Sequence, residues 1–278
     1  MYPIFRNEVL KTYLKWRTYI GFVGIAVIVP LVEVGLKLEG GGMVKQMTRS
    51  LEQDFFFVGN LFNAYFVTTF IMNSLFVHIP FLISLVAGDQ LAGEATGGTF
   101  RLMLISPVSR TRILFAKYLT TLFYTLTLVA FLGALSVGLG IILFGTGDLI
   151  VPGRMLVIIP QADVAWRLCI AFGLATWSMW CIASLAFLFS SLVENAIGPI
   201  IATMTVVIIF LLISNIPVEL FQSIRPYLFT TYSNVWMNML EEPIPWPDVF
   251  RSVSILGAFS IGFVMATWYI FARKDILS

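Results

Sequence analysis

The sequence predicts an all-α integral membrane protein with six transmembrane helices, and three observations support this. Apolar residues make up 59% of the chain and charged residues only 12%. The mean hydropathy is +0.92, far above that of soluble proteins. The chain also contains long apolar runs, and about 20 apolar residues suffice for one helix to cross the hydrocarbon core. Runs of this length exclude a transmembrane β-barrel, whose strands need only about 10 residues.

The whole chain, residues 1–278, is predicted to be a single transmembrane domain. It begins with an N-terminal interfacial amphipathic helix at residues 1–18, in which apolar residues recur every three or four positions. The six predicted spans are residues 19–36, 61–87, 113–144, 164–189, 197–216 and 252–272.

The segment at residues 217–251 is apolar, but its five prolines prevent one continuous helix. We therefore expect this segment to be extracytoplasmic or re-entrant.

The distribution of basic residues predicts the orientation of the chain. An even number of spans places both termini on one side of the membrane. If that side is the cytoplasm, ten of the 17 basic residues face it, in agreement with the positive-inside rule. We therefore expect a multi-pass protein of the inner (cytoplasmic) membrane with both termini in the cytoplasm.

The sequence offers little of the chemistry of enzymes. His78 is the only histidine, so zinc sites with two histidines cannot form. No GxxxxGK[ST] phosphate-binding loop occurs. The charged residues Glu33 and Arg167 lie near the ends of spans, where they can pair locally, and this disfavours a proton-driven carrier. We expect this chain to bind no cofactor, no metal and no nucleic acid.

One dense polar segment lies between the second and third spans, at residues 88–112. Gly93, Gly97 and Gly98 interrupt its helical potential, and Pro107 begins a turn. Ser109 is placed to cap the next helix, whose first turn begins with Arg110. The segment is consistent with a short helix across the cytoplasmic side of the bundle. A solvated loop whose charges only set the topology is the alternative.

The run AGEATGGTFRLMLISPVSR, from Ala92 to Arg110, is followed by Ile113, Leu114 and Lys117. It resembles the segment between the second and third spans of ABC-2 type permeases. That family has a glutamate, a Gly-Thr pair, two leucines, Pro-(Val/Leu)-Ser-Arg and then a lysine that enters the third helix. The resemblance implies the transmembrane permease subunit of an ATP-binding cassette (ABC) transporter, which is not itself an enzyme.

The resemblance also implies which residues contact an ATPase. Residues 94–104 would be a coupling helix seated in a groove of the ATPase subunit, and the loop at 190–198 would be a second, smaller contact. The implied coupling-helix contacts are Asp89, Glu94, Thr99, Arg101 and Leu104. The implied cytoplasmic turn contains Pro107, Ser109 and Arg110, and the second contact contains Glu194 and Asn195.

The resemblance implies several partners as well. Two copies of an ABC ATPase would bind the ATP and Mg²⁺. A second permease copy or a homologous permease would complete the transporter within membrane lipid, and the family expectation is export along the dimer interface. Two alternatives remain open. One is a permease serving periplasmic cofactor or metal-enzyme assembly, and the other is a six-span membrane enzyme or scaffold with no ATPase partner.

Overall fold

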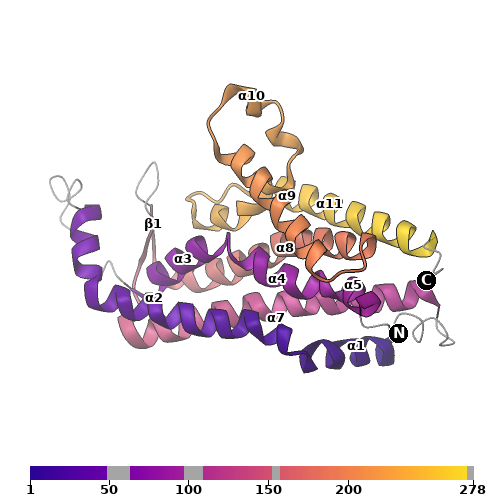
Figure 1. The fold of residues 1–278 in the computed structure, drawn as a ribbon. Helices are drawn as coiled ribbons and strands as arrows, with labels where there is room; N and C mark the ends of the chain where they lie inside the picture. Colours follow the sequence, from indigo (N-terminus) through magenta and orange to yellow (C-terminus); the bar gives the residue numbers. More distant parts are fainter. Residues whose placement is uncertain (49–62, 97–108, 152–156, 274–278) are drawn as a thin grey trace.

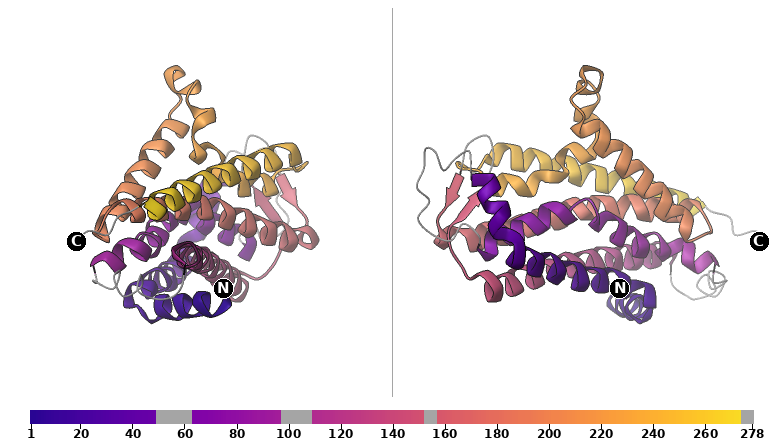
Figure 2. Two further views of the ribbon diagram at one scale, coloured as in Figure 1. Left: turned by 90° about the vertical axis from the view of Figure 1, so that its right-hand side faces the viewer. Right: turned by 60° about the vertical axis from the view of Figure 1, so that its left-hand side comes forward.

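A computed structural model describes residues 1–48, 63–96, 109–151 and 157–273 (Figure 1). Long helices run side by side in one bundle. The N-terminus and the last turn of the final helix lie at the same end of this bundle, which we call the terminal end. A short arm near residue 220 projects from the side of the bundle, as two further views show (Figure 2).

The helices account for nearly all of the described structure. Within the described residues they are α1 (Tyr2–Leu14), α2 (Trp16–Thr48), α3 (Ala64–Leu75), α4 (Ile79–Ala87), α5 (Asp89–Thr96), α7 (Arg110–Phe144), α8 (Gln161–Leu192), α9 (Ile197–Asn215), α10 (Glu219–Gln222) and α11 (Trp246–Arg273). Two 3₁₀ helices, η1 (Arg225–Tyr227) and η2 (Phe229–Leu240), lie between α10 and α11.

A small β-hairpin departs from the all-α prediction. Strands β1 (Leu149–Val151) and β2 (Val157–Ile159) pair antiparallel, with Leu149 opposite Ile159. Both strands are made of Leu, Ile and Val, and β-branched residues favour extended structure. The hairpin joins α7 to α8 at the end of the bundle opposite the terminal end (Figure 1).

Five helices are long and apolar enough to cross a membrane: α2 over Trp16–Glu39, α7, α8, α9 and α11. The length and apolarity of these helices therefore support the prediction of a helical, multi-pass membrane protein. The run at 61–87 was expected to form one helix, but α3 and α4 meet at a bend of 56°. Pro80 explains this break, because its ring clashes with the carbonyl group of Phe76 one turn earlier.

Three further helix boundaries differ from the prediction. The amphipathic helix expected at 1–18 ends at Leu14, because Lys15 is extended (φ −77°, ψ 130°). Helix α2 continues to Thr48, well beyond residue 36, although its candidate span ends at Glu39. The last span begins at Trp246 and not at 252, since Pro247 lies in the first turn of α11, where its missing N–H costs nothing.

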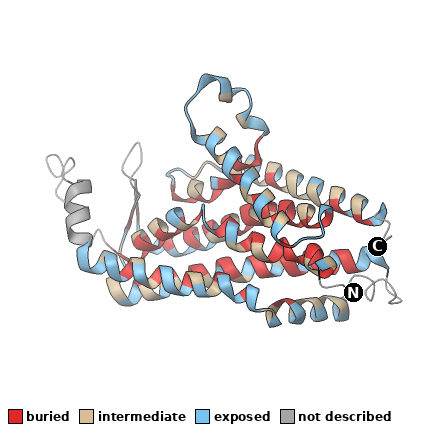
Figure 3. Ribbon diagram, viewed as in Figure 1, coloured by how far each residue is buried: buried red, intermediate tan, exposed pale blue. Residues whose placement is uncertain are grey.

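Helix α8 is the centre of the bundle. In an apolar stretch of 18 residues of α8, 61% of the residues are buried. In the corresponding stretches of the other four candidate spans, the buried share is 17–28%. It packs against α4, α7, α9, α11 and η2. Figure 3 shows buried residues concentrated along these central helices, whereas α10 is exposed.

The segment expected to be extracytoplasmic or re-entrant, residues 217–251, contains α10, η1, η2 and the start of α11. The η2 helix packs into the bundle, where Trp236 is fully buried and its ring lies 5.9 Å from that of Phe76. Arg167, at the start of α8, holds the far end of η2. It donates to the Glu241 carbonyl oxygen at 3.1 Å and forms an ion pair with Glu242.

Candidate functional site

The candidate site is built around α5, at the terminal end of the bundle. Gly88, which joins α4 to α5, keeps helical backbone angles (φ −68°, ψ −26°), so α5 follows α4 with almost no interruption. A Cβ at Gly88 would lie 2.8 Å from the Ser84 carbonyl oxygen and 3.1 Å from Pro199. The glycine therefore allows the start of α9 to pack closely on this junction.

Glu94 of α5 is buried in an ion-pair cluster. Lys117 of α7 is 1% exposed, and its Nζ lies 3.1 Å from Glu94 Oε1 and 2.7 Å from Glu8 Oε2. Lys11 of α1 also pairs with Glu94. A buried lysine is tolerated only where carboxylates compensate the lost hydration of its charge. The cluster therefore joins α1, α5 and α7.

Asp89, at the start of α5, forms a second group of ion pairs. Its carboxylate accepts from Lys15 Nζ at 2.7 Å and from Arg17 Nη1 at 3.1 Å. One turn later, a Cβ at Gly93 would lie only 2.4 Å from Asp89 Oδ1. Glycine at position 93 thus leaves the space that this carboxylate occupies. Together, the ion pairs around α5 involve four basic and three acidic side chains: Glu8, Lys11, Lys15, Arg17, Asp89, Glu94 and Lys117.

Helix α1 is held against α7 as well as against α5. The Tyr13 hydroxyl group is hydrogen-bonded to Thr127, and its ring packs edge-on against Phe123 and Tyr124. Burial raises the pKa of Tyr13 above its ordinary value, while the hydrogen bond with Thr127 acts in the opposite direction. Tyr13 is therefore neutral at physiological pH.

Ser190, near the end of α8, binds the first turn of α5. Its Oγ accepts from the backbone N–H groups of Leu91 and Ala92, both at 3.0 Å, and donates to the Gly88 carbonyl oxygen at 2.6 Å. The first N–H groups of any helix lack partners within the helix. A side chain from a distant helix therefore serves as the cap of α5.

The other end of α5 contacts the loop between α8 and α9. Thr96 Oγ1 donates to the Glu194 carbonyl oxygen at 2.7 Å. Glu194 and Asn195 are both exposed, and the Asn195 side chain accepts from the backbone N–H of Ile197 at 3.0 Å. The structure thus places side by side two segments that the sequence suggested as separate contact regions.

The positions of Asp89 and Glu94 differ from the expectation of contacts with a partner. Both residues are buried within this chain, at 7% and 4% exposure, where Lys11 of α1 pairs with Glu94 and Lys15, which follows α1, pairs with Asp89. Their carboxylates fix the position of α5 and do not form an outer surface. Four of the implied contact residues lie outside the described residues: Thr99, Arg101, Leu104 and Pro107.

Ser109 and Arg110 lie at the start of α7, and both are exposed. Ser109 occupies the N-cap position, but its side chain makes no capping hydrogen bond, contrary to the expectation.

The sequence named Lys117 only as part of the family pattern and Ser190 only as the first residue of the second contact loop, and it did not assign Glu8 to the site. Lys117 carries a signal that could have been used, because a lysine inside an apolar span requires a nearby carboxylate. Ser190 carries none, since a serine in an apolar helix usually bonds to its own backbone. Within the described ranges, no three His, Cys, Asp or Glu residues gather as a metal site.

Comparison with known proteins relates the chain to a protein family and to a bacterial protein. A family model described as "Protein of unknown function (DUF2705)" matches residues 43–277. The chain is also similar to a protein of Bacillus subtilis (strain 168), "Uncharacterized protein YhcI", with 26% identity over 206 residues. That similarity covers 69% of this chain and 63% of the relative, so the chain spans less than two thirds of the relative's length.

Proposed function

We propose that this chain, which belongs to the DUF2705 family, is the membrane-spanning permease subunit of an ABC transporter. In this proposal α3 and α4 together form one of six spans, and the terminal end of the bundle lies in the cytoplasm. The chain works as a dimer with a second permease, and two copies of a separate ATPase bind the nucleotide. Export through a pathway between the two permeases is the direction that we infer.

The observation that carries this proposal is the way in which α5 is held. Ser190 attaches its start to α8, Thr96 attaches its end to the α8–α9 loop, and Glu94 attaches it to α1 and α7. A solvated loop that only sets topology needs none of these contacts. An element that receives a displacement and passes it to several spans needs all of them.

The proposed mechanism is mechanical. When the ATPase subunits close around nucleotide, they would press on the exposed end of α5 at Thr96 and on the exposed loop that contains Glu194 and Asn195. The buried ion pairs would then pass the displacement to α1 and α7, and Ser190 would pass it to α8. Such a partner can shift the conformation only if its contacts differ in strength between the two states.

Copurification tests this proposal. The tagged chain is expressed in its own host and extracted in mild detergent, and the proteins bound to it are identified by mass spectrometry. We expect a protein with a GxxxxGK[ST] nucleotide-binding loop, and vanadate-sensitive ATP hydrolysis in the purified complex. Glu194→Arg should remove most of this partner, because it reverses an exposed charge in the contact loop.

Glu219→Arg is the matched control. Glu219 is also exposed and acidic, but it lies on α10, away from the terminal end (Figure 1). This variant should retain the partner at the level of the unaltered chain. Absence of any ATPase from the complex would favour the membrane enzyme or scaffold instead. Equal loss of the ATPase in both variants would argue against the contact loop.

A further inference from the structure

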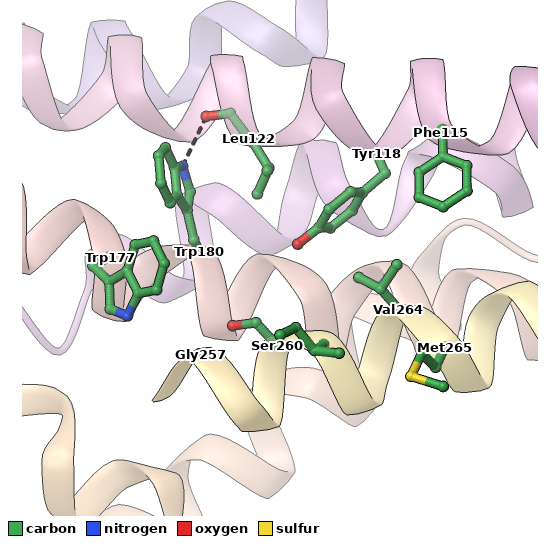
Figure 4. A pocket seen from close by; sticks show the side chains of 10 residues that line it. Phe115, Tyr118, Leu122, Trp177, Trp180, Gly257, Ser260, Val264 and Met265 are labelled. Carbon is green, nitrogen blue, oxygen red and sulfur yellow. Dashed lines mark hydrogen bonds between the residues drawn. The ribbon is translucent and has the colours of Figure 1, made fainter. Parts of the chain in front are cut away.

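An apolar groove opens between α7, α8 and α11 (Figure 4). Its cavity volume is about 460 Å³, within the range of roughly 300–1,000 Å³ that small-molecule pockets have. A Cβ at Gly257 of α11 would lie 3.3 Å from the ring of Trp177, so this glycine provides space for the indole. The groove is therefore a shaped cavity between three helices of the bundle.

The polar side chains of the groove wall have hydrogen-bond partners within the protein. The bonds are Tyr118 with Ser184 at 2.9 Å, Trp177 to the Val253 carbonyl at 3.0 Å, Trp180 to the Leu122 carbonyl at 3.0 Å, and Ser260 to the Leu256 carbonyl at 2.9 Å. An occupant thus meets a surface of carbon atoms together with the Met265 sulfur atom. Hydrocarbon suits such a surface, because a buried polar group would find no partner there.

Beyond the groove, toward the terminal end of the bundle, α7 and α11 carry aromatic and basic side chains that we call the rim. Trp268 of α11 donates to Thr111 of α7 at 3.4 Å, which joins the two helices. Arg112 is exposed next to Thr111, and Arg273 lies 4.3 Å from the ring of Tyr269. Among the described residues, neither arginine takes part in an ion pair.

We propose that this groove holds one acyl chain of an anionic phospholipid, and that Arg112 and Arg273 bind the phosphate of its headgroup. Guanidinium groups bind phosphate through paired, charge-assisted hydrogen bonds. Trp and Tyr are the side chains that gather at the headgroup level of a bilayer. The apolar wall and the basic rim together match both ends of such a lipid. This proposal is independent of the proposed transport function.

Quenching of tryptophan fluorescence tests the site. The purified full chain in detergent micelles is titrated with phosphatidylglycerol that carries bromine on one acyl chain, because bromine quenches nearby indoles such as Trp177 and Trp180. Brominated phosphatidylcholine provides the comparison without a net negative charge. We expect phosphatidylglycerol to reach half-maximal quenching at a concentration about tenfold lower.

Two sets of variants separate the groove from the rim. Ser260→Leu with Val264→Phe fills the groove and should abolish the saturable quenching, whereas Ile142→Phe, at an 80% exposed position elsewhere on α7, should not. Arg112→Gln with Arg273→Gln should reduce the affinity for phosphatidylglycerol to that for phosphatidylcholine. Arg6→Gln, at an exposed position on α1, should leave the tenfold preference intact.

The proposal is wrong if the groove-filled variant still binds brominated phosphatidylglycerol like the unaltered chain. It is also wrong if Arg112→Gln with Arg273→Gln keeps the preference for phosphatidylglycerol over phosphatidylcholine. This second test remains valid even if the groove-filled variant does not fold. If the groove-filled variant has a lower particle mass by light scattering, and bromolipid still quenches its tryptophans as in the unaltered chain, the groove holds a second copy of the chain.

Discussion

Lys117 Nζ lies 3.1 Å from Glu94 Oε1, and both side chains are almost completely removed from water. The two residues come from different helices, α7 and α5, and their pair is completed by Glu8 and Lys11 of α1. Removing one partner of a buried ion pair leaves an uncompensated charge, which is more costly than losing an exposed pair. Substitutions in this cluster should therefore reduce the stability of the protein more than substitutions at the other contacts of α5.

Lys117→Met should destabilise the protein by about 3–5 kcal/mol, because Glu94 and Glu8 lose the cation between them. The measurement is the apparent melting temperature in detergent. Adding Glu94→Gln to Lys117→Met should restore some of the loss, since fewer buried charges then lack a partner. Arg6→Gln, at an exposed position of α1, should change the stability by no more than about 0.5 kcal/mol. Equal melting temperatures for Lys117→Met and Arg6→Gln would contradict the assignment.

Ser190→Ala should loosen the start of α5. The N–H groups of Leu91 and Ala92 lose their acceptor, and the loss of a helix cap typically costs about 1 kcal/mol. Hydrogen–deuterium exchange in residues 89–96 should become faster. Ser136→Ala is the control, because the Ser136 hydroxyl donates only to carbonyl groups of its own helix. Unchanged exchange in Ser190→Ala would show that another group caps α5.

Gly93→Ala should be destabilising although alanine favours helices. The new methyl group would lie 2.4 Å from Asp89 Oδ1 and would displace this carboxylate from Lys15 and Arg17. Such overpacking costs roughly 1–3 kcal/mol. Gly173→Ala in α8, where a Cβ meets nothing within 4 Å, should instead be neutral or stabilise by up to about 1 kcal/mol. Melting temperatures that shift in the same direction would refute this explanation.

Arg167→Gln should release the loop that follows η2. The variant loses the ion pair with Glu242 and the hydrogen bond to the Glu241 carbonyl oxygen. A hydrogen bond to a charged group contributes about 1.5–3 kcal/mol, which corresponds to at least a tenfold increase in local opening. Cleavage after Glu241 by a glutamate-specific protease should accelerate accordingly. Arg251→Gln, at an exposed position on α11, should be cleaved at the original rate.

The sequence was sufficient to locate the five helices that are long and apolar enough to cross a membrane, because a pattern of length and apolarity can be read directly from the residues. It was less informative about where helices break. Pro80 carried a readable signal for the bend between α3 and α4, whereas nothing in the local sequence marked the extended backbone of Lys15. Proline acts through its own ring, but the break at Lys15 depends on contacts made elsewhere in the fold.

The orientation of the α5 side chains was the least predictable feature. Glu94 and Asp89 looked exposed because they lie in a polar segment between spans. Their burial depends on α1, whose Lys11 is 83 residues away from Glu94 in the sequence. The cap from Ser190 is likewise a tertiary contact, across 99 residues to Leu91. Local patterns carry no information about such pairings, so only the fold could reveal them.

The break between α3 and α4 has a geometric consequence for the segment beyond it. From Ile79 to Thr96 the backbone is helical almost throughout, including Gly88, and at 1.5 Å per residue this stiff rod is roughly 27 Å long. If the rod pivots by about 10° at the break, its tip at Thr96 travels roughly 5 Å. A small rotation at the break would thus move the end of α5 by several ångströms while α3 keeps its position in the bundle.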